Sequence, residues 1–248
     1  MRTYTFTDSA LPNLLRSALF ALALVLLTPP YSVVALMTVV LPRHSRWRII
    51  SGWSRCVIWL ARTLLGLRYQ VEGLENLTDS PAIILSKHQS AWETVAFQLI
   101  FPPQVHVLKK ELLWIPFFGW GLALMSPIAI DRGRGVRSLR QMAAQGATRL
   151  AQGFWIVVFP EGTRVAPGAS GTYKVGGAWL AVRTGAPVIP VAHNAGMFWR
   201  RNAFTKRPGT IRVVIGKPIA STDISPELLN EKVKFWIENE MLALRPGP

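Results

Sequence analysis

Cysteine is almost absent from this 248-residue chain, which contains only Cys56. One thiol cannot form an internal disulfide framework, and it cannot supply a zinc cluster that needs several thiolates. Three familiar catalytic patterns are also missing: the Gly-x-x-x-x-Gly-Lys-Ser/Thr phosphate loop, the Gly-x-Ser-x-Gly nucleophile elbow and the His-Glu-x-x-His zinc helix. Since the histidines are few and dispersed, no metal site is predicted; they are His44, His88, His106 and His193.

Acidic residues are scarce as well, with 13 Asp and Glu against 28 Lys and Arg, a formal net charge of +15. Such a chain is attracted to polyanions: nucleic acid, an anionic membrane surface, or acidic substrates and carriers. Half of the residues are nevertheless apolar and ten are Trp, and the mean hydropathy is +0.27. This combination excludes wholesale disorder and favours a membrane surface over nucleic acid. The length suggests one domain with room for an appendage.

One long segment has no charge at all. Residues 17–42, between Arg16 and Arg43, are uncharged and largely apolar, with Pro29 and Pro30 in their middle. Two arrangements fit equally well: a spanning helix kinked at the prolines, or two short helices joined there that enter one leaflet and return. A kinked core helix of a soluble protein is the alternative. A cleaved signal peptide is disfavoured, because no small-x-small site follows the first apolar half.

Residues 43–68 form a basic amphipathic pattern without any acid. Tryptophan and aliphatic residues recur between the arginines at roughly helical spacing, which predicts a helix on an anionic membrane surface. An ordinary domain helix with a solvated basic face is the alternative. The excess of positive charge places the chain after Arg43 in the cytoplasm. We therefore divide the chain into a membrane-associated helical segment, residues 1–68, and a second domain, residues 69–248.

Residues 69–248 alternate between short apolar runs and helical patterns, with no internal repeat. Strands are predicted at 81–86, 105–108, 154–159, 187–191 and 211–215, and helices near 91–101, 136–152, 174–184 and 226–243. Ser225-Pro226 supplies a cap and a first-turn proline for the last helix. Continuous apolar strands separated by helices predict an α/β fold with a mostly parallel sheet covered on both faces.

The first candidate site directly follows the strand 81–86. Ser90-x-x-Glu93 is typical of a capping box, in which Glu93 reaches back to the Ser90 amide. In the functional interpretation, Glu93 instead reaches the imidazole of His88, fixes its tautomer and raises its basicity. A His–carboxylate pair without a nearby Ser or Cys nucleophile suits general-base activation of a substrate hydroxyl.

The second candidate site, Phe159-Pro-Glu-Gly-Thr-Arg164, ends the strand 154–159. Glu161 and Arg164 could hold a phosphate or hydroxyl group, or they could pair with each other at a turn. A third stretch runs from Lys109-Lys-Glu through Ile115-Pro-Phe-Phe-Gly119 to Ile130-Asp-Arg132. Alone, it would pass for a turn and a basic surface patch.

Together, in this order, these motifs resemble the 1-acylglycerol-3-phosphate acyltransferase family over nearly the full length of the chain. The family's His-x-x-x-x-Asp block is matched by His88 with Glu93 in the acid position. Its second block resembles the stretch from Lys109 to Gly119 together with 130–132. Its third block is matched at every position by 159–164, and its fourth resembles Val188-Ile-Pro-Val191.

The resemblance implies transfer of an acyl group, from acyl-CoA or acyl carrier protein, to the 2-hydroxyl of 1-acylglycerol-3-phosphate (lysophosphatidic acid), with no metal and no cofactor beyond the acyl donor. His88 is then the general base and Glu93 orients it, while Lys109 and Arg164 bind the phosphate. The residues expected to position the rest of the acceptor are Arg132, Glu161, Gly162 and Thr163. The resemblance also favours N-terminal helices that enter one leaflet, here of the inner membrane, with the catalytic domain on its cytoplasmic side and no nucleic acid as partner.

Two residues depart from the family pattern. Glu93 replaces the usual Asp and is longer by one methylene. Lys87 stands where Asn is frequent, and its charge could weaken the basicity of His88 or contact a phosphate of the donor. Two other functions stay open: acylation of another lysolipid, such as a lyso-ornithine lipid, and a basic protein without activity that binds anionic lipid or nucleic acid.

Overall fold

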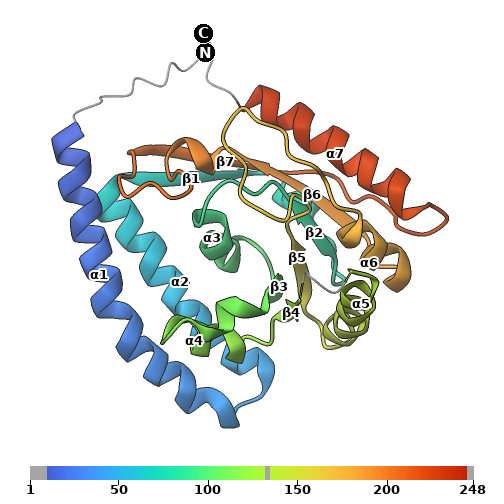
Figure 1. Ribbon diagram of the computed structural model, residues 1–248, viewed down its shortest axis with the longest axis horizontal. Helices are drawn as coiled ribbons and strands as arrows, with labels where there is room; N and C mark the ends of the chain where they lie inside the picture. The colour runs from blue at the N-terminus through green and yellow to red at the C-terminus, as the bar shows by residue number, and fades with distance from the viewer. Residues whose placement is uncertain (1–9, 132–134, 245–248) are drawn as a thin grey trace.

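A seven-stranded sheet with helices on both faces forms the centre of the protein (Figure 1). The computed structural model describes residues 10–131 and 135–244. The strands cross the sheet in the order β1-β7-β6-β2-β5-β3-β4, and all neighbours are parallel except β6 and β7. The predicted mostly parallel α/β fold is confirmed. The strands are β1 (Leu67–Glu72), β2 (Ile83–Ser86), β3 (Gln104–Lys109), β4 (Ile128–Ile130), β5 (Trp155–Val158), β6 (Val188–His193) and β7 (Gly209–Ile215).

Five of these strands lie where the apolar runs predict them. β2, β5 and β6 are buried along their whole length, which explains why their sequences are continuously apolar. The prediction misses β1 and β4. β1 exposes every second residue, including Arg68 and Glu72, and β4 has only three residues, so neither leaves a strong apolar signal.

Four helices confirm the predicted helical patterns: α3 (Trp92–Ile100), α5 (Gly135–Ala151), α6 (Gly176–Thr184) and α7 (Pro226–Ala243). Ser225 caps α7 as expected, since its hydroxyl accepts from the Leu228 amide at 3.2 Å. The short helix α4 (Phe118–Leu124) and the 3₁₀ turn η3 (Lys110–Trp114) before it were not predicted. The remaining helices are α1 (Ala10–Met37) and α2 (Arg43–Leu65), with 3₁₀ turns η1 (Thr38–Val40), η2 (Leu74–Asn76) and η5 (Ala195–Met197).

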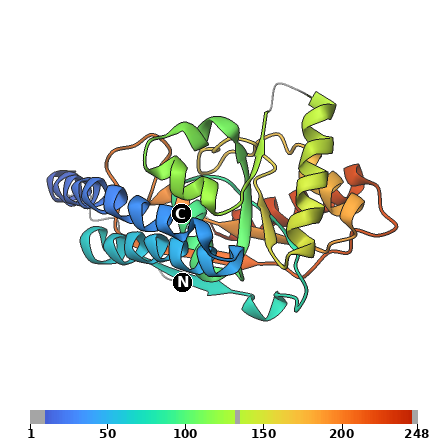
Figure 2. The same ribbon diagram turned by 90° about the horizontal axis from the view of Figure 1, so that it is seen from below.

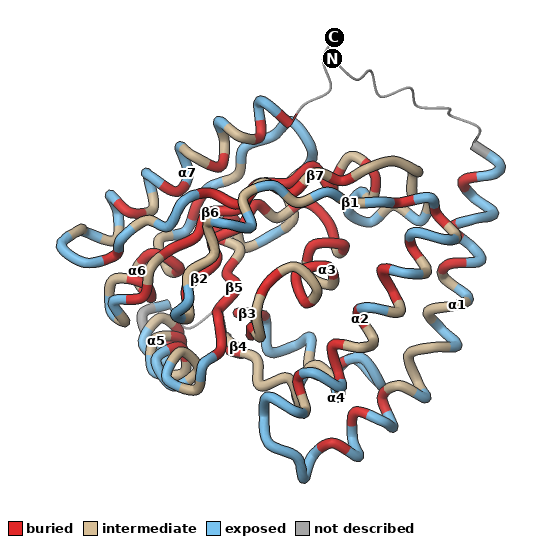
Figure 3. Tube along the Cα trace, turned by 180° about the vertical axis from the view of Figure 1, so that it is seen from behind, coloured by how far each residue is buried: buried red, intermediate tan, exposed pale blue. Residues whose placement is uncertain are grey.

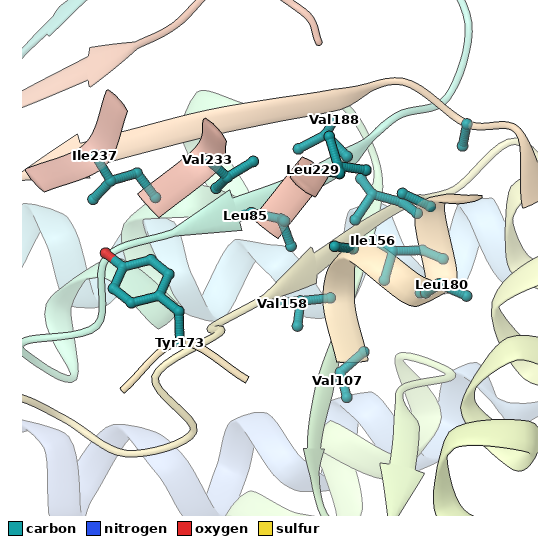
Figure 4. Close-up of a cluster of buried hydrophobic side chains, with 14 of the residues drawn as sticks. Leu85, Val107, Ile156, Val158, Tyr173, Leu180, Val188, Leu229, Val233 and Ile237 are labelled. Atoms are coloured by element: carbon teal, nitrogen blue, oxygen red, sulfur yellow. The ribbon is translucent and has the colours of Figure 1, made fainter. Parts of the chain in front are cut away.

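Each face of the sheet has its own hydrophobic core. On one face, α5, α6 and α7 pack on side chains such as Leu85, Ile156 and Val188 (Figure 4). On the other face, α2 and α3 pack on alternate residues of the same strands, such as Ile84 and Val157. Figures 2 and 3 show the resulting layers, with buried residues concentrated in the central strands and mostly exposed residues along α1.

Helix α1 corrects one prediction, because the chain does not turn at Pro29-Pro30. The helix is continuous from Ala10 to Met37, and the reversal comes at η1, before α2 begins at Arg43. Proline removes a backbone donor from a helix interior and crowds the preceding turn. Here the hydroxyls of Thr28 and Ser32 bond back to carbonyls four residues earlier, at 2.7 and 2.8 Å, and packing against α2 holds the helix together.

Helix α2 joins the N-terminal segment to the sheet. Val57, Ala61 and Leu65 are buried in the same core as the β strands, and Gly66, in the left-handed conformation at φ 67°, ends α2 and turns the chain into β1. Residues 1–68 and 69–248 therefore share one core where the structure describes them. α1 packs on the outer side of α2 (Figure 1).

Candidate active site

The candidate motifs meet at the carboxyl ends of neighbouring strands. His88 follows β2, residues 159–164 follow β5, and Lys109 ends β3. In the sheet, β5 lies between β2 and β3, and all three run in parallel. This edge of a parallel sheet is where α/β proteins place their binding sites.

His88 and Glu93 are in direct contact. Nδ1 of His88 lies 2.9 Å from Oε1 of Glu93, and the glutamate side chain is completely buried. The same oxygen accepts the amide protons of Gln89 and Ser90 at 2.9 and 2.7 Å. Both interpretations of Glu93 therefore hold at once, since it closes the turn before α3 and faces the imidazole. Helix α3 begins at Trp92, after Ala91, one residue later than a cap at Ser90 implies.

Glu93 is held in its ionised form. Burial alone would raise its pKa, but the neighbouring imidazoles of His193 and His88 and the Ser90 amide together lower the pKa of Glu93. An ionised carboxylate only accepts hydrogen bonds, so Nδ1 of His88 carries the proton that it donates. In the neutral ring, Nε2 of His88 is then unprotonated and able to accept a proton.

His193 lies next to this pair, and the sequence analysis did not predict it as a site residue. It is fully buried at the end of β6, with Nε2 3.9 Å from Oε1 of Glu93. The Ala195 amide donates to Nδ1 at 3.3 Å, so Nε2 carries the proton and donates to the Lys87 carbonyl at 2.8 Å. Burial lowers the pKa of His193. Its only sequence signal was its position after the apolar segment around Pro190.

Aromatic rings border the His88 imidazole. Phe159 stacks on it at 4.1 Å between ring centroids and 17° between planes. The ring of His106 on β3 lies 6.1 Å from that of Phe159, between centroids. Burial, and secondarily the neighbouring His88, lowers the pKa of His106 to about 4, so this imidazole is neutral near pH 7.

Lys87 lies in a buried ion pair, which disagrees with one of the two roles left open for it, a contact with a donor phosphate. Its Nζ is 2.7 Å from Oε1 of Glu161 and 2.8 Å from Oε1 of Glu238 on α7. Tyr173 donates to the same Glu238 oxygen at 2.8 Å. Lys87 is completely buried and does not line the cavity described below. Its charge is therefore matched by carboxylates beneath the site.

Glu161 differs from its predicted contacts as well. Its carboxylate pairs with Lys87 instead of Arg164, and its second oxygen accepts the His88 amide proton at 2.8 Å. The Val165 amide in turn donates to the His88 carbonyl at 2.8 Å. Burial raises the pKa of Glu161 although Lys87 opposes the shift. Glu161 therefore ties the loop after β5 to the backbone of His88, and its side chain does not line the cavity.

Cationic side chains gather beside His88. Lys109 and Arg164 line the same cavity as His88, together with Gly162 and Thr163. Lys174 and Arg201 also line it, although sequence reasoning did not select them. Gly162 is in the left-handed conformation at φ 67°, and a Cβ there would lie 3.3 Å from Nζ of Lys174. Arg132 lies outside the described residues.

The cavity has a volume of about 740 Å³ and extends from these cations into an apolar interior. Trp53 of α2, Phe118 and Leu122 of α4, and Leu139 and Met142 of α5 line that interior. A volume in this range accommodates a ligand of several hundred daltons. Among residues 10–131 and 135–244, no three His, Cys, Asp or Glu side chains are grouped to hold a metal ion.

An α/β sheet with a histidine–carboxylate pair at the head of a partly cationic, partly apolar cavity fits an enzyme that transfers acyl groups. Residues 68–194 match the family model described as Acyltransferase, and the protein is an acyltransferase. It is 46% identical to a 1-acyl-sn-glycerol-3-phosphate acyltransferase of Pseudomonas aeruginosa, over 84% of this chain and 82% of the relative. It is 30% identical to the Saccharomyces cerevisiae enzyme of that name, over 81% and 67%.

A solved structure agrees with these relatives. The crystal structure of the 1-acyl-sn-glycerophosphate (LPA) acyltransferase, PlsC, from Thermotoga maritima matches with a TM-score of 0.79 at 25% identity, covering 96% of this chain and 99% of the other. The chain therefore belongs to the 1-acyl-sn-glycerol-3-phosphate acyltransferase family, of the bacterial type.

Proposed function

We propose that the protein transfers a fatty acyl group from acyl-CoA or acyl carrier protein to the 2-hydroxyl of 1-acylglycerol-3-phosphate and so forms phosphatidic acid. The observation that carries this proposal is the His88–Glu93 pair at 2.9 Å, with the imidazole lining a cavity that also holds Lys109 and Arg164. A base, an anion-binding end and an apolar interior are the three features that this reaction requires.

The reaction proceeds by direct transfer. The acceptor hydroxyl oxygen attacks the thioester carbonyl carbon while Nε2 of His88 takes its proton. The carbon–sulfur bond then breaks, and the imidazolium returns the proton to the leaving thiolate, so the products are the new ester and the free thiol of the donor. Glu93 keeps Nδ1 protonated and stabilises the imidazolium during the transfer.

The phosphate of the acceptor binds to the cationic end of the cavity. Arg164 and Lys109 supply charge-assisted donors, and Lys174, next to Gly162, adds a third cation. Gly162 and Thr163 face the glycerol, and Arg132 is expected to help hold the acceptor. Glu161 takes a different role from the one first expected, because its contacts make it a positioning residue for the His88 backbone.

The N-terminal helices support the proposal that the protein is bound to a membrane. Leu11–Val40 is long and apolar enough to cross a bilayer. Only 17% of its most apolar stretch of 18 residues is buried, which argues against the core helix of a soluble protein. Arg48, Arg55 and Arg62 recur every seven residues on α2, are exposed, and flank the exposed Trp59. This stripe is suited to anionic lipid headgroups of the inner membrane, with the catalytic domain on the cytoplasmic side.

The decisive experiment is an assay of the purified protein with one labelled acyl donor and a panel of lysolipids. We expect phosphatidic acid from 1-acylglycerol-3-phosphate at a higher kcat/KM than product from a lyso-ornithine lipid or a lysolipid with a larger head group. A preference for another acceptor would reject the proposed substrate. No transfer to any acceptor, together with salt-sensitive lipid binding, would support a binding protein without activity.

A further inference from the structure

Residues 112–120 run from the end of η3 through the turn at 115–117 into the first residues of α4, and they form an exposed aromatic segment that we call the aromatic loop. The loop presents six large apolar side chains to solvent within nine residues, and Trp114 is 82% exposed. The six are Leu112, Trp114, Ile115, Phe117, Phe118 and Trp120. Soluble proteins scatter such residues singly, and a contiguous group of them marks an interaction surface.

This aromatic loop is continuous with the apolar surface of α1. The α carbon of Gly121 faces Ala35, since a Cβ built there lies 3.8 Å from the Ala35 methyl group. The ring of Phe118 lies 5.7 Å from that of Trp53 on α2. Figures 1 and 2 both show α4 alongside α1 and α2. The chain just after Ala35 is apolar and exposed as well, through Leu36, Met37, Val39 and Val40.

The same loop forms a wall of the active-site cavity. Leu112, Phe117 and Phe118 line the cavity, as does Leu122 in the next turn of α4. Trp114 and Trp120 do not line it and stand on the outside. This part of the cavity wall therefore presents apolar side chains both to the cavity and to the outer surface.

A lipid leaflet is the occupant that fits this surface. Tryptophan and phenylalanine are typical of segments that enter the interfacial region of a bilayer, and the loop holds two residues of each kind. The patch continues onto α1, whose apolar side chains are exposed around much of its circumference. The family relatives are named for an acceptor that is itself a lipid.

We propose that the aromatic loop 112–120 is a second bilayer contact, separate from α1, and that it brings the cavity wall into the leaflet. The lysolipid then passes from the leaflet to His88 along Leu112, Phe117 and Phe118 without crossing water. This inference rests on the proposed function only for the lipid nature of the acceptor.

A fluorescent label tests the contact without using activity. Cys56→Ser provides a background free of thiols, in which Trp114→Cys is labelled with the environment-sensitive dye NBD. Phe235→Cys is the matched control, because Phe235 is 72% exposed on α7, across the sheet from α4 (Figure 1). The full chain is incorporated into vesicles of phosphatidylethanolamine and phosphatidylglycerol that contain spin-labelled lipid.

We expect blue-shifted emission and strong quenching by spin-labelled lipid at position 114 and neither effect at position 235. Equal quenching at the two positions would overturn the proposal. So would a blue shift at position 114 that appears in detergent and grows with protein concentration, because a second copy of the chain would then cover the loop.

Kinetics supply the second test. Trp114→Ser should lower kcat/KM for a lysolipid embedded in vesicles by about tenfold, with activity unchanged on a short-chain lysolipid that is monomeric in solution. Phe235→Ser should change neither. Equal losses on both acceptors would show a merely structural role and contradict the proposal. If the wild type acylates no lysolipid, the proposed function fails while the label still reports on the loop.

Discussion

Glu93 serves two purposes with one oxygen. Oε1 accepts from two backbone amides and also contacts Nδ1 of His88. The extra methylene relative to the family's usual aspartate lets the side chain fold back from the first turn of α3 to both groups. The departure in sequence therefore keeps a carboxylate in contact with His88.

Replacement of Glu93 by Gln should lower kcat by about 10- to 100-fold with little change in the acceptor KM, because the imidazolium loses its counter-charge but keeps a neighbour of the same shape. Initial rates at saturating donor, with the melting temperature as a control for folding, measure this. A rise in the acceptor KM with kcat unchanged would place Glu93 in substrate binding instead.

His106 makes stability depend on pH. Its pKa is about 4 in the folded protein and about 6.5 when unfolded, so between these values the unfolded chain binds more protons. The folding stability that the neutral His106 contributes is fully present above pH 6.5. It declines by about 2–3 kcal/mol as the pH falls towards 4. The buried His193, whose pKa is also lowered, acts in the same direction.

His106→Phe should therefore flatten the loss of stability between pH 6.5 and 4. Denaturant titrations of wild type and variant in detergent at pH 7 and pH 4.5 measure the difference. If the two proteins lose the same stability over this range, His106 is not the neutral buried group described above.

At the scale of elements, the sequence reveals local patterns but not distant partners. The apolar runs of β2, β5 and β6 predict strands because both faces of the sheet are covered. Lys87 gives no such signal, because its partner Glu238 lies 151 residues later on α7. His193 is likewise assigned to the site only by the fold, which brings the end of β6 beside β2.

The buried ions connect three elements, which makes their loss costly. Lys87→Met leaves Glu161 buried without its cation, so unfolding free energy should fall by about 3–5 kcal/mol. The double variant Lys87→Met/Glu161→Gln should recover part of that loss, and Glu231→Gln on the exposed side of α7 should change nothing. Denaturant titration of these proteins, together with wild type and the single variant Glu161→Gln, measures the losses. A loss in the double variant equal to the sum of the two single losses would contradict the ion pair.

The aromatic loop and α1 show why turns at proline and glycine are poor guides here. Of the two arrangements that fit Pro29-Pro30, the pair of short helices is wrong, because α1 continues through both prolines and packs against α2. Pro116 does lie in the turn before α4, but Gly119 lies inside the helix. Local propensity decides only where no neighbouring element overrides it.

For the whole molecule, the net charge of +15 divides into distinct surfaces. The stripe of Arg48, Arg55 and Arg62 lies on the outside of α2, whereas Lys109, Arg164, Lys174 and Arg201 border the cavity. The first group is suited to headgroups and the second to a phosphorylated acceptor and an anionic donor. The attraction to polyanions that the net charge predicts is thus divided between two separate groups of cationic side chains.

Replacing the three stripe arginines by Gln should weaken binding to anionic vesicles by about 1 kcal/mol per residue, with binding to neutral vesicles unchanged. The matched control replaces the exposed Arg137, Arg140 and Arg183 of α5 and α6, on the other face of the sheet. Sedimentation with vesicles at low and high salt measures both. Equal losses of vesicle binding in the two triple variants would show that the arginines of the stripe act only through the net charge of the protein.

The turnover of His88→Ala, at saturating acyl donor and 1-acylglycerol-3-phosphate, tests the central claim most directly. His44→Ala is the control, since His44 is exposed and does not line the cavity. With the melting temperature and vesicle binding unchanged, kcat of His88→Ala should fall by about 10²- to 10⁴-fold, while His44→Ala stays close to wild type. Near-normal turnover by folded His88→Ala would contradict general-base catalysis by His88.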